Sequence, residues 1–242
     1  MPRQIKQCAW EIYLKNILNI YQNTAFYFGI RFFVAFLIRQ LPLHSFLHQI
    51  VGIIWVLSLV PMDLWWRKSL VDLIKEEKLI PKNVFFFYQN DSLCQKGIFA
   101  QILCEGGNLW FWGIGSGLRA GEGAANFFGF AFEFLGLAVP FLFALLIQPF
   151  YVLILLSPQK NLSSALSLSW KAMSGKRKEL LSLWSSLIPW LVLLLLSGIL
   201  AHISRLWLTS LLSYGIMLLA CVSILPYVTL CGIFFSLRIL ES

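Results

Sequence analysis

Long apolar runs, separated by shorter polar connections, follow one another along most of the chain. About 20 apolar residues at 1.5 Å per residue cross a hydrocarbon core about 30 Å thick, so runs near this length are candidate transmembrane helices. Six segments qualify, at about residues 24–38, 45–61, 97–118, 127–156, 180–202 and 206–237. The pattern predicts an all-α protein, a polytopic helical membrane bundle with about six transmembrane helices.

Three of these segments are irregular. The third is interrupted by the polar residues 105–108, so whether it forms a regular helix is left open. The fourth and sixth are longer than a membrane requires, because a straight helix of about 30 residues extends about 45 Å. We expect them to tilt, to project beyond the bilayer, or to kink at Pro140, Pro149 or Pro226.

Positive charge falls on alternate connections. Of the 19 Lys and Arg residues, 15 lie in the segments that share one side if the N-terminus is cytoplasmic. The connections on the other side hold only Arg39, Arg119 and Arg205. Short loops rich in Lys and Arg stay in the cytoplasm, so we expect both termini to be cytoplasmic.

Composition agrees with a membrane protein. The chain is 59% hydrophobic and 12% charged, whereas a typical globular domain has about 25% charged residues. We expect a single integral membrane domain over residues 1–242. The net charge of +8 is spread over the connections, so no nucleic-acid partner is predicted. The five cysteines show no CxxC spacing, so we predict no disulfide, no metal site and no cofactor.

Two stretches on the predicted cytoplasmic side have amphipathic patterns typical of interfacial helices. In the first, residues 63–79, Asp63 is a possible N-cap, and Trp65 and Trp66 suit the headgroup level. The apolar face of this first helix would hold Leu64, Val71 and Ile74.

The second stretch begins after Ser157. Asn161 can cap the start of a helix, and Gly175 can supply the left-handed residue at its end. The apolar positions at helical spacing are Leu162, Leu166, Trp170 and Met173. A basic cluster follows, in which each charge near an anionic leaflet is worth about 1 kcal/mol, and its members are Lys176, Arg177 and Lys178.

The run ALSLSWKAMSGKRKELLSLWSSLIPWLVLL, Ala165 to Leu194, resembles the Ala, Ser, Met, Gly and Lys pattern of DUF975, a family of bacterial integral membrane proteins. The resemblance covers roughly residues 139–237, and its further matches are Tyr151, Pro226, Tyr227, Phe234 and Phe235. One departure is that the family's Pro-Gly pair appears here as Pro140-Phe141. The resemblance implies a helical scaffold in a bacterial cytoplasmic membrane and supplies no established catalytic residue.

Three ionisable residues lie inside predicted spans: Arg31, Glu105 and Glu133. Such residues are costly in lipid and therefore candidate functional groups. Either carboxylate could pair with Arg31. Two interpretations stay open: a buried ion pair that fixes helix register, or a polar pathway or headgroup site.

Two other patterns do not reach a recognisable site. His44 and His48 could share a helix face, but no cysteine or carboxylate accompanies them, so they are incomplete as a zinc site. The glycines from Gly106 to Gly123 lack the GxxxxGK[ST] sequence of a phosphate-binding loop, and close helix packing explains them better.

No catalytic motif is present, so the first hypothesis is a scaffold or regulatory membrane protein, not an enzyme. Its partners would be the lipid bilayer, anionic lipid at the cytoplasmic face, and another membrane protein or a second copy of the chain. An alternative is a transporter or translocation subunit with a polar intramembrane pathway. A membrane enzyme acting on lipid headgroups, with Glu105 and Glu133 as acid and base, is a third hypothesis.

Overall fold

The computed structural model describes residues 2–40, 45–76, 90–119, 128–129, 147–190, 192–193, 196 and 207–241. This part of the chain is almost entirely helical and contains no strand. The fold class is therefore all-α. The helices are α1 (Pro2–Lys15), α2 (Ile17–Gln40), α3 (Ser45–Ser58), α4 (Val60–Glu76), α6 (Asp91–Arg119), α8 (Leu162–Met173), α9 (Arg177–Ser185) and α11 (Trp207–Glu241), with a further helix at Ile147–Leu156.

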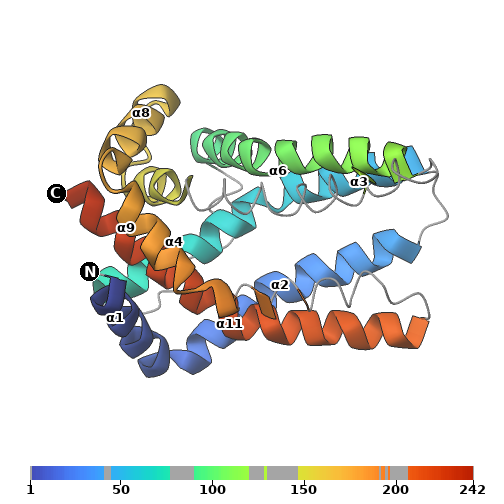
Figure 1. The fold of residues 1–242 in the computed structure, drawn as a ribbon, viewed down its shortest axis with the longest axis horizontal. Helices are drawn as coiled ribbons and strands as arrows, with labels where there is room; N and C mark the ends of the chain where they lie inside the picture. The colour runs from blue at the N-terminus through green and yellow to red at the C-terminus, as the bar shows by residue number, and fades with distance from the viewer. Residues whose placement is uncertain are drawn as a thin grey trace.

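Helix α4 occupies the centre of the arrangement and packs against α2, α6 and α11 (Figure 1). Helices α2 and α11 lie side by side, and α1 folds back against α11. Helices α8 and α9 lie at the end of the molecule where both chain termini are found (Figure 1).

Two helical stretches, Ile50–Lys75 and Gly215–Leu240, are long and apolar enough to cross a membrane, judged by length and composition alone. The question left open for residues 97–118 is answered, because α6 continues through Glu105 and the glycines from Gly106 to Gly117 as one helix of 29 residues. The predicted span 127–156 is described only at residues 128–129 and 147–156.

Helix α11 agrees with the predicted segment 206–237 and holds Pro226 inside it. Proline removes one backbone hydrogen bond and crowds the preceding turn, which bends a helix. Figure 1 shows that α11 changes direction along its length, as expected.

The prediction of an interfacial helix over residues 63–79 is wrong where the structure describes it. Helix α4 begins at Val60, so Asp63 lies inside the helix and is not its N-cap. Leu64, Trp65 and Trp66 are each at most 5% exposed, which places them in the bundle core and not at a headgroup surface. The reason is that α4 carries apolar side chains on several faces, and the neighbouring helices bury most of them.

The second amphipathic helix forms as predicted, but only part of its apolar face is buried. Helix α8 contacts α11 and buries Ala165, Ser169 and Met173, while Leu166 and Trp170 are 37% and 65% exposed. Asn161 occupies the N-cap position without a side-chain cap bond. Gly175 has φ +82°, which confirms the predicted left-handed residue.

The predicted span 180–202 does not start as one continuous helix. Helix α9 ends at Ser185, and the next hydrogen bonds, Leu187 N–H to Trp184 O and Trp190 N–H to Leu187 O, link residues three apart. Pro189 explains the break, because it lacks the N–H that would continue the α-helical pattern.

Candidate functional site

A largely buried ion pair lies on α4, at the centre of the bundle. Arg67 Nε donates to Asp63 Oδ2 at 2.8 Å, and the two side chains are only 18% and 12% exposed. The residues are four apart, so one face of the helix presents both. A charge this far from water must be paired and hydrogen-bonded, and the remaining donors of Arg67 therefore require partners from other helices.

Helix 147–156 supplies two of these partners. Arg67 Nη1 donates to Gln148 Oε1 at 2.9 Å, and the guanidinium lies 4.3 Å from the centroid of the Tyr151 ring, a cation–π geometry. The Tyr151 hydroxyl is 3.5 Å from Gln101 Oε1 on α6. Helix α11 leaves room for this packing at Gly232, where a Cβ would lie 3.2 Å from Gln148 Cγ.

Helix α2 closes the other side of the ion pair. The Tyr27 hydroxyl donates to Asp63 Oδ1 at 3.2 Å and accepts a hydrogen bond from Arg31 Nη1 at 3.0 Å. Tyr27 therefore links two arginines to one carboxylate. We call the set Arg31, Tyr27, Asp63, Arg67, Gln148 and Tyr151 the arginine network.

Aromatic rings cover the network beside α2. The Tyr27 ring stacks on Trp66 with centroids 5.6 Å apart, and Phe28 meets Trp66 edge-on at the same separation. Trp66 Nε1 donates to Thr24 Oγ1 at 3.0 Å. This packing excludes water from the Tyr27–Asp63 bond, which strengthens the electrostatic interactions beneath it.

A buried lysine fixes the N-terminal part of α6. Lys96 is 7% exposed, and its Nζ donates to the Pro158 carbonyl at 2.6 Å. Pro158 lies two residues beyond the end of helix 147–156, so the ammonium lies near the end where the helix dipole is negative. Lys96 is one of the 15 basic residues that the sequence assigns to the cytoplasmic side, and its described contact joins α6 to the segment after helix 147–156.

The structure describes only some of the candidate residues that were singled out from the sequence. Arg31 belongs to the arginine network. The side chain of Glu105, all of Glu133 and the side chains of both histidines lie outside the described residues, so neither proposed pairing of Arg31 with a glutamate is tested. In the basic cluster, Lys176 Nζ is 3.8 Å from Glu179 Oε1, and Arg177 lies 5.1 Å from the Trp170 ring centroid.

Sequence reasoning missed Asp63 and Arg67 as a site because it assigned them to a surface helix. Their spacing of four residues beside an apolar run was the available signal. Nothing local in the sequence pointed to Gln148 or Tyr151, which reach Arg67 from about 80 residues along the chain.

The arrangement is suited to holding helices together. The described contacts join all six members into one connected cluster, and the Tyr151 hydroxyl extends it to Gln101 on α6. Among the described residues, no group of three His, Cys, Asp or Glu side chains could hold a metal ion. Comparison with protein families, curated proteins and solved structures gives no match to this chain.

Proposed function

We propose that this protein is a multi-pass integral membrane protein of about six spans that acts as a scaffold or regulatory subunit. The support for membrane embedding is that two described helices expose large apolar side chains, while an ion pair lies largely buried between helices. Helix α2 exposes Leu18, Phe26, Phe33 and Leu37 along one face, at 46–74% exposure. Helix α11 exposes Leu212, Ile216 and Leu219 at helical spacing. Soluble proteins rarely expose continuous apolar surfaces of this extent.

We place both termini in the cytoplasm, on the basis of the charge distribution. The position of both termini at one end of the bundle is compatible with this orientation (Figure 1). The resemblance to DUF975 favours a bacterial cytoplasmic membrane, and it remains part of the proposal.

The single observation that carries the scaffold role is the arginine network, because its described contacts join α2, α4 and helix 147–156. A transport pathway requires polar groups that can exchange partners with a substrate. Here Arg67 is bound by Asp63 and Gln148 and stacked on Tyr151. An internal cluster of this kind fixes the register of the helices that contribute to it.

The surface for lipids or partners is the outer face of α8 and α9. Trp170 and Leu166 project from α8, and Arg177 stacks against the Trp170 ring. Exposed apolar side chains beside basic ones are the pattern of a helix that lies in the headgroup region. We therefore assign anionic lipid to this face, and a membrane-protein partner or a second copy to the same surface.

The test is mass spectrometry of lipids and proteins that co-purify with the full chain in mild detergent. Replacing Lys176, Arg177 and Lys178 together by Gln should lower retention of anionic lipid, by about fivefold for each charge that contacts the leaflet. The matched control replaces Arg3, Lys6 and Lys160 by Gln, which removes the same charge elsewhere on the predicted cytoplasmic side. Equal lipid retention in both triple variants would contradict the assignment of anionic lipid to the outer face of α8 and α9.

Vesicle flux distinguishes the scaffold from the transporter. We expect vesicles that contain the protein to leak protons and small ions no faster than vesicles that contain the Arg31→Gln variant. A flux that requires Arg31 would replace the scaffold proposal with the transport hypothesis.

A further inference from the structure

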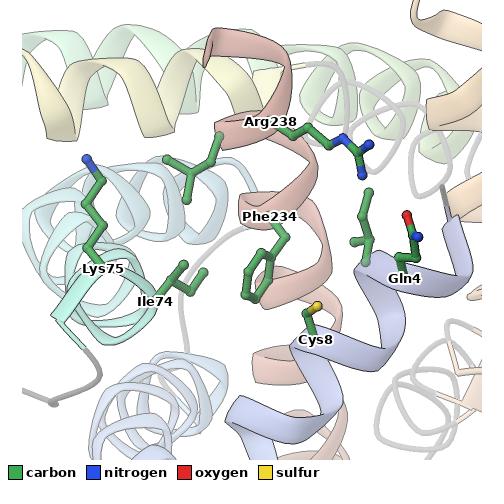
Figure 2. A pocket seen from close by; sticks show the side chains of 8 residues that line it. Gln4, Cys8, Ile74, Lys75, Phe234 and Arg238 are labelled. Carbon is green, nitrogen blue, oxygen red and sulfur yellow. The ribbon is translucent and has the colours of Figure 1, made fainter. Parts of the chain in front are cut away.

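A hollow of about 360 Å³ lies apart from the arginine network, where α1, α4 and α11 meet. The start of α1 contributes Gln4 and Cys8, the end of α4 contributes Ile74 and Lys75, and the end of α11 contributes Phe234 and Arg238. Figure 2 shows Arg238 reaching toward Gln4 at one end and Lys75 at the opposite end, with the Cys8 thiol beside Phe234 between them. Phe234 lies between the two ends.

The hollow combines positive charge with an apolar wall. Both of its ionised side chains are cations, and none of its described lining residues is acidic. Gln4 belongs to the first turn of α1, where backbone N–H groups lack partners within the helix and add positive partial charge. The wall between the cations is formed by side chains such as Ile74 and Phe234. This combination suits an anion that carries an apolar part.

Neither of the two cations forms an ion pair with another described residue. Arg67, Lys68 and Lys176 each have a carboxylate partner, whereas Lys75 and Arg238 have none among the described residues. Both lie in the last turn of their helices, where a positive charge offsets the helix dipole. That effect accounts for basic residues at these positions, but it does not require them to share a hollow with Gln4.

We propose that this hollow binds the phosphate group of an anionic ligand, with Arg238 and Gln4 as the donors nearest the phosphate and Lys75 as a second charge. Helical stretches 50–75 and 215–240, which could cross a membrane, both end beside it. In the orientation proposed above, on which this step rests, the hollow lies at the depth of cytoplasmic headgroups. Basic pockets between helices at that depth bind the headgroups of anionic lipids. A small soluble phosphate ester shares the same chemistry.

Cys8 provides a local reporter, because its thiol is exposed and lines the hollow. Cys221 and Cys231 are buried. Burial, followed by the nearby Asp91 carboxylate, raises the pKa of the Cys94 thiol, which slows its alkylation at a given pH. Alkylation of the full chain by a maleimide, followed by peptide mass spectrometry, therefore measures the hollow separately from the other described cysteines.

The experiment adds phosphatidylglycerol, phosphatidylcholine, glycerol 3-phosphate or inorganic phosphate to the protein in detergent and follows the rate at Cys8. We expect phosphatidylglycerol to slow the reaction. Arg238→Gln and Lys75→Gln should each weaken that protection by about fivefold. Lys160→Gln and Lys171→Gln are controls of equal charge, and slow alkylation of Cys221 and Cys231 shows that each variant is folded.

The arms identify the source of the phosphate. Protection by phosphatidylglycerol alone assigns a lipid headgroup, and equal protection by glycerol 3-phosphate assigns a small soluble ester. The proposal is overturned if none of the phosphate compounds protects Cys8, or if Arg238→Gln is protected as well as the wild type. The alkylation assay is done in detergent, so its result does not depend on the proposed orientation in the membrane. Mapping the chain termini in intact cells tests that orientation separately.

Discussion

At the scale of single residues, the arginine network couples helices that are distant in the sequence. Asp63 is its only carboxylate among the described members, and it accepts hydrogen bonds from Arg67 and Tyr27. Both charged side chains are less than one-fifth exposed. Removal of one partner from such a pair leaves a charge that neither water nor protein compensates.

We therefore expect Asp63→Asn to cost about 3 kcal/mol of stability, measured by thermal unfolding in detergent. The double variant Asp63→Asn with Arg67→Gln should lose less than the single variant, because the Arg67 charge that Asp63 directly pairs is removed as well. Lys176→Gln is the control: its pair with Glu179 is exposed, so its removal should change little. If the double variant loses the sum of the two single losses, the residues do not act as a pair.

The chemistry of these residues was only partly predictable. Arg31 stands out in an apolar run, because a charge at that depth needs a reason. Its expected partners were glutamates, whereas the described contact is the hydroxyl of Tyr27. A tyrosine in an aromatic segment carries no sequence signal for this role. The sequence around Gln148 gives no signal either, since only the packing of helix 147–156 against α4 brings its side chain to Arg67.

At the scale of elements, the position of α4 depends on a close approach by α6. The helices meet at Gly97, where a Cβ would lie 2.7 Å from both Leu64 Cδ1 and Val60 Cγ1. Leu64 and Val60 are 0% and 3% exposed, so neither side chain has open space into which it can move. The glycine therefore sets the distance between the two helices.

Gly97→Ala should destabilise the protein by about 1–3 kcal/mol through overpacking. Gly29→Ala on α2 is the matched control, because nothing lies within 4 Å of its Cβ position. Alanine favours a helix over glycine, so the control should be neutral or stabilising by up to about 1 kcal/mol. Thermal unfolding of both variants provides the comparison. A destabilised Gly29→Ala variant with an unaffected Gly97→Ala variant would contradict the packing described here.

The boundaries of the elements were more predictable than their environments. The segments 206–237 and 97–118 correspond to α11 and α6. Apolar length specifies the first, whereas the second was left open because residues 105–108 interrupt it. The assignment of α4 to a surface failed for a physical reason. Asp63 and Arg67 lie among apolar residues, so the sequence pattern is that of an amphipathic helix. In the structure these two side chains form an ion pair, which allows the helix to be buried. In α8, a face of Ala165 and Ser169 packs closely, while the larger Trp170 stays outside.

At the scale of the whole molecule, two helices of the described part expose large apolar side chains, although the core between the helices is also apolar. The charged pair lies at the centre, and α2 and α11 present large apolar side chains outward. Charge alternation along the sequence predicted a membrane protein and an orientation. It could not predict which face of each helix meets lipid, because that depends on which faces the other helices cover.

The outward faces allow the proposed membrane embedding to be tested directly. Phe33 on α2 and Leu219 on α11 are 63% and 69% exposed. If they face lipid, Phe33→Lys and Leu219→Lys should each oppose insertion by about 3 kcal/mol, the cost of a lysine near the centre of a transmembrane helix. The measurement is the fraction of protein that remains in membranes after an alkaline carbonate wash.

Leu168→Lys is the matched control, since Leu168 lies on α8 and is 39% exposed. A lysine there can reach water or anionic headgroups, so membrane retention should not fall. Lower membrane retention of Phe33→Lys and Leu219→Lys than of Leu168→Lys would show that lipid surrounds the first two positions. A soluble bundle would tolerate lysine at all three. Full membrane retention of Phe33→Lys and Leu219→Lys would mean that α2 and α11 do not present these faces to lipid, and the six-span arrangement would have to be abandoned.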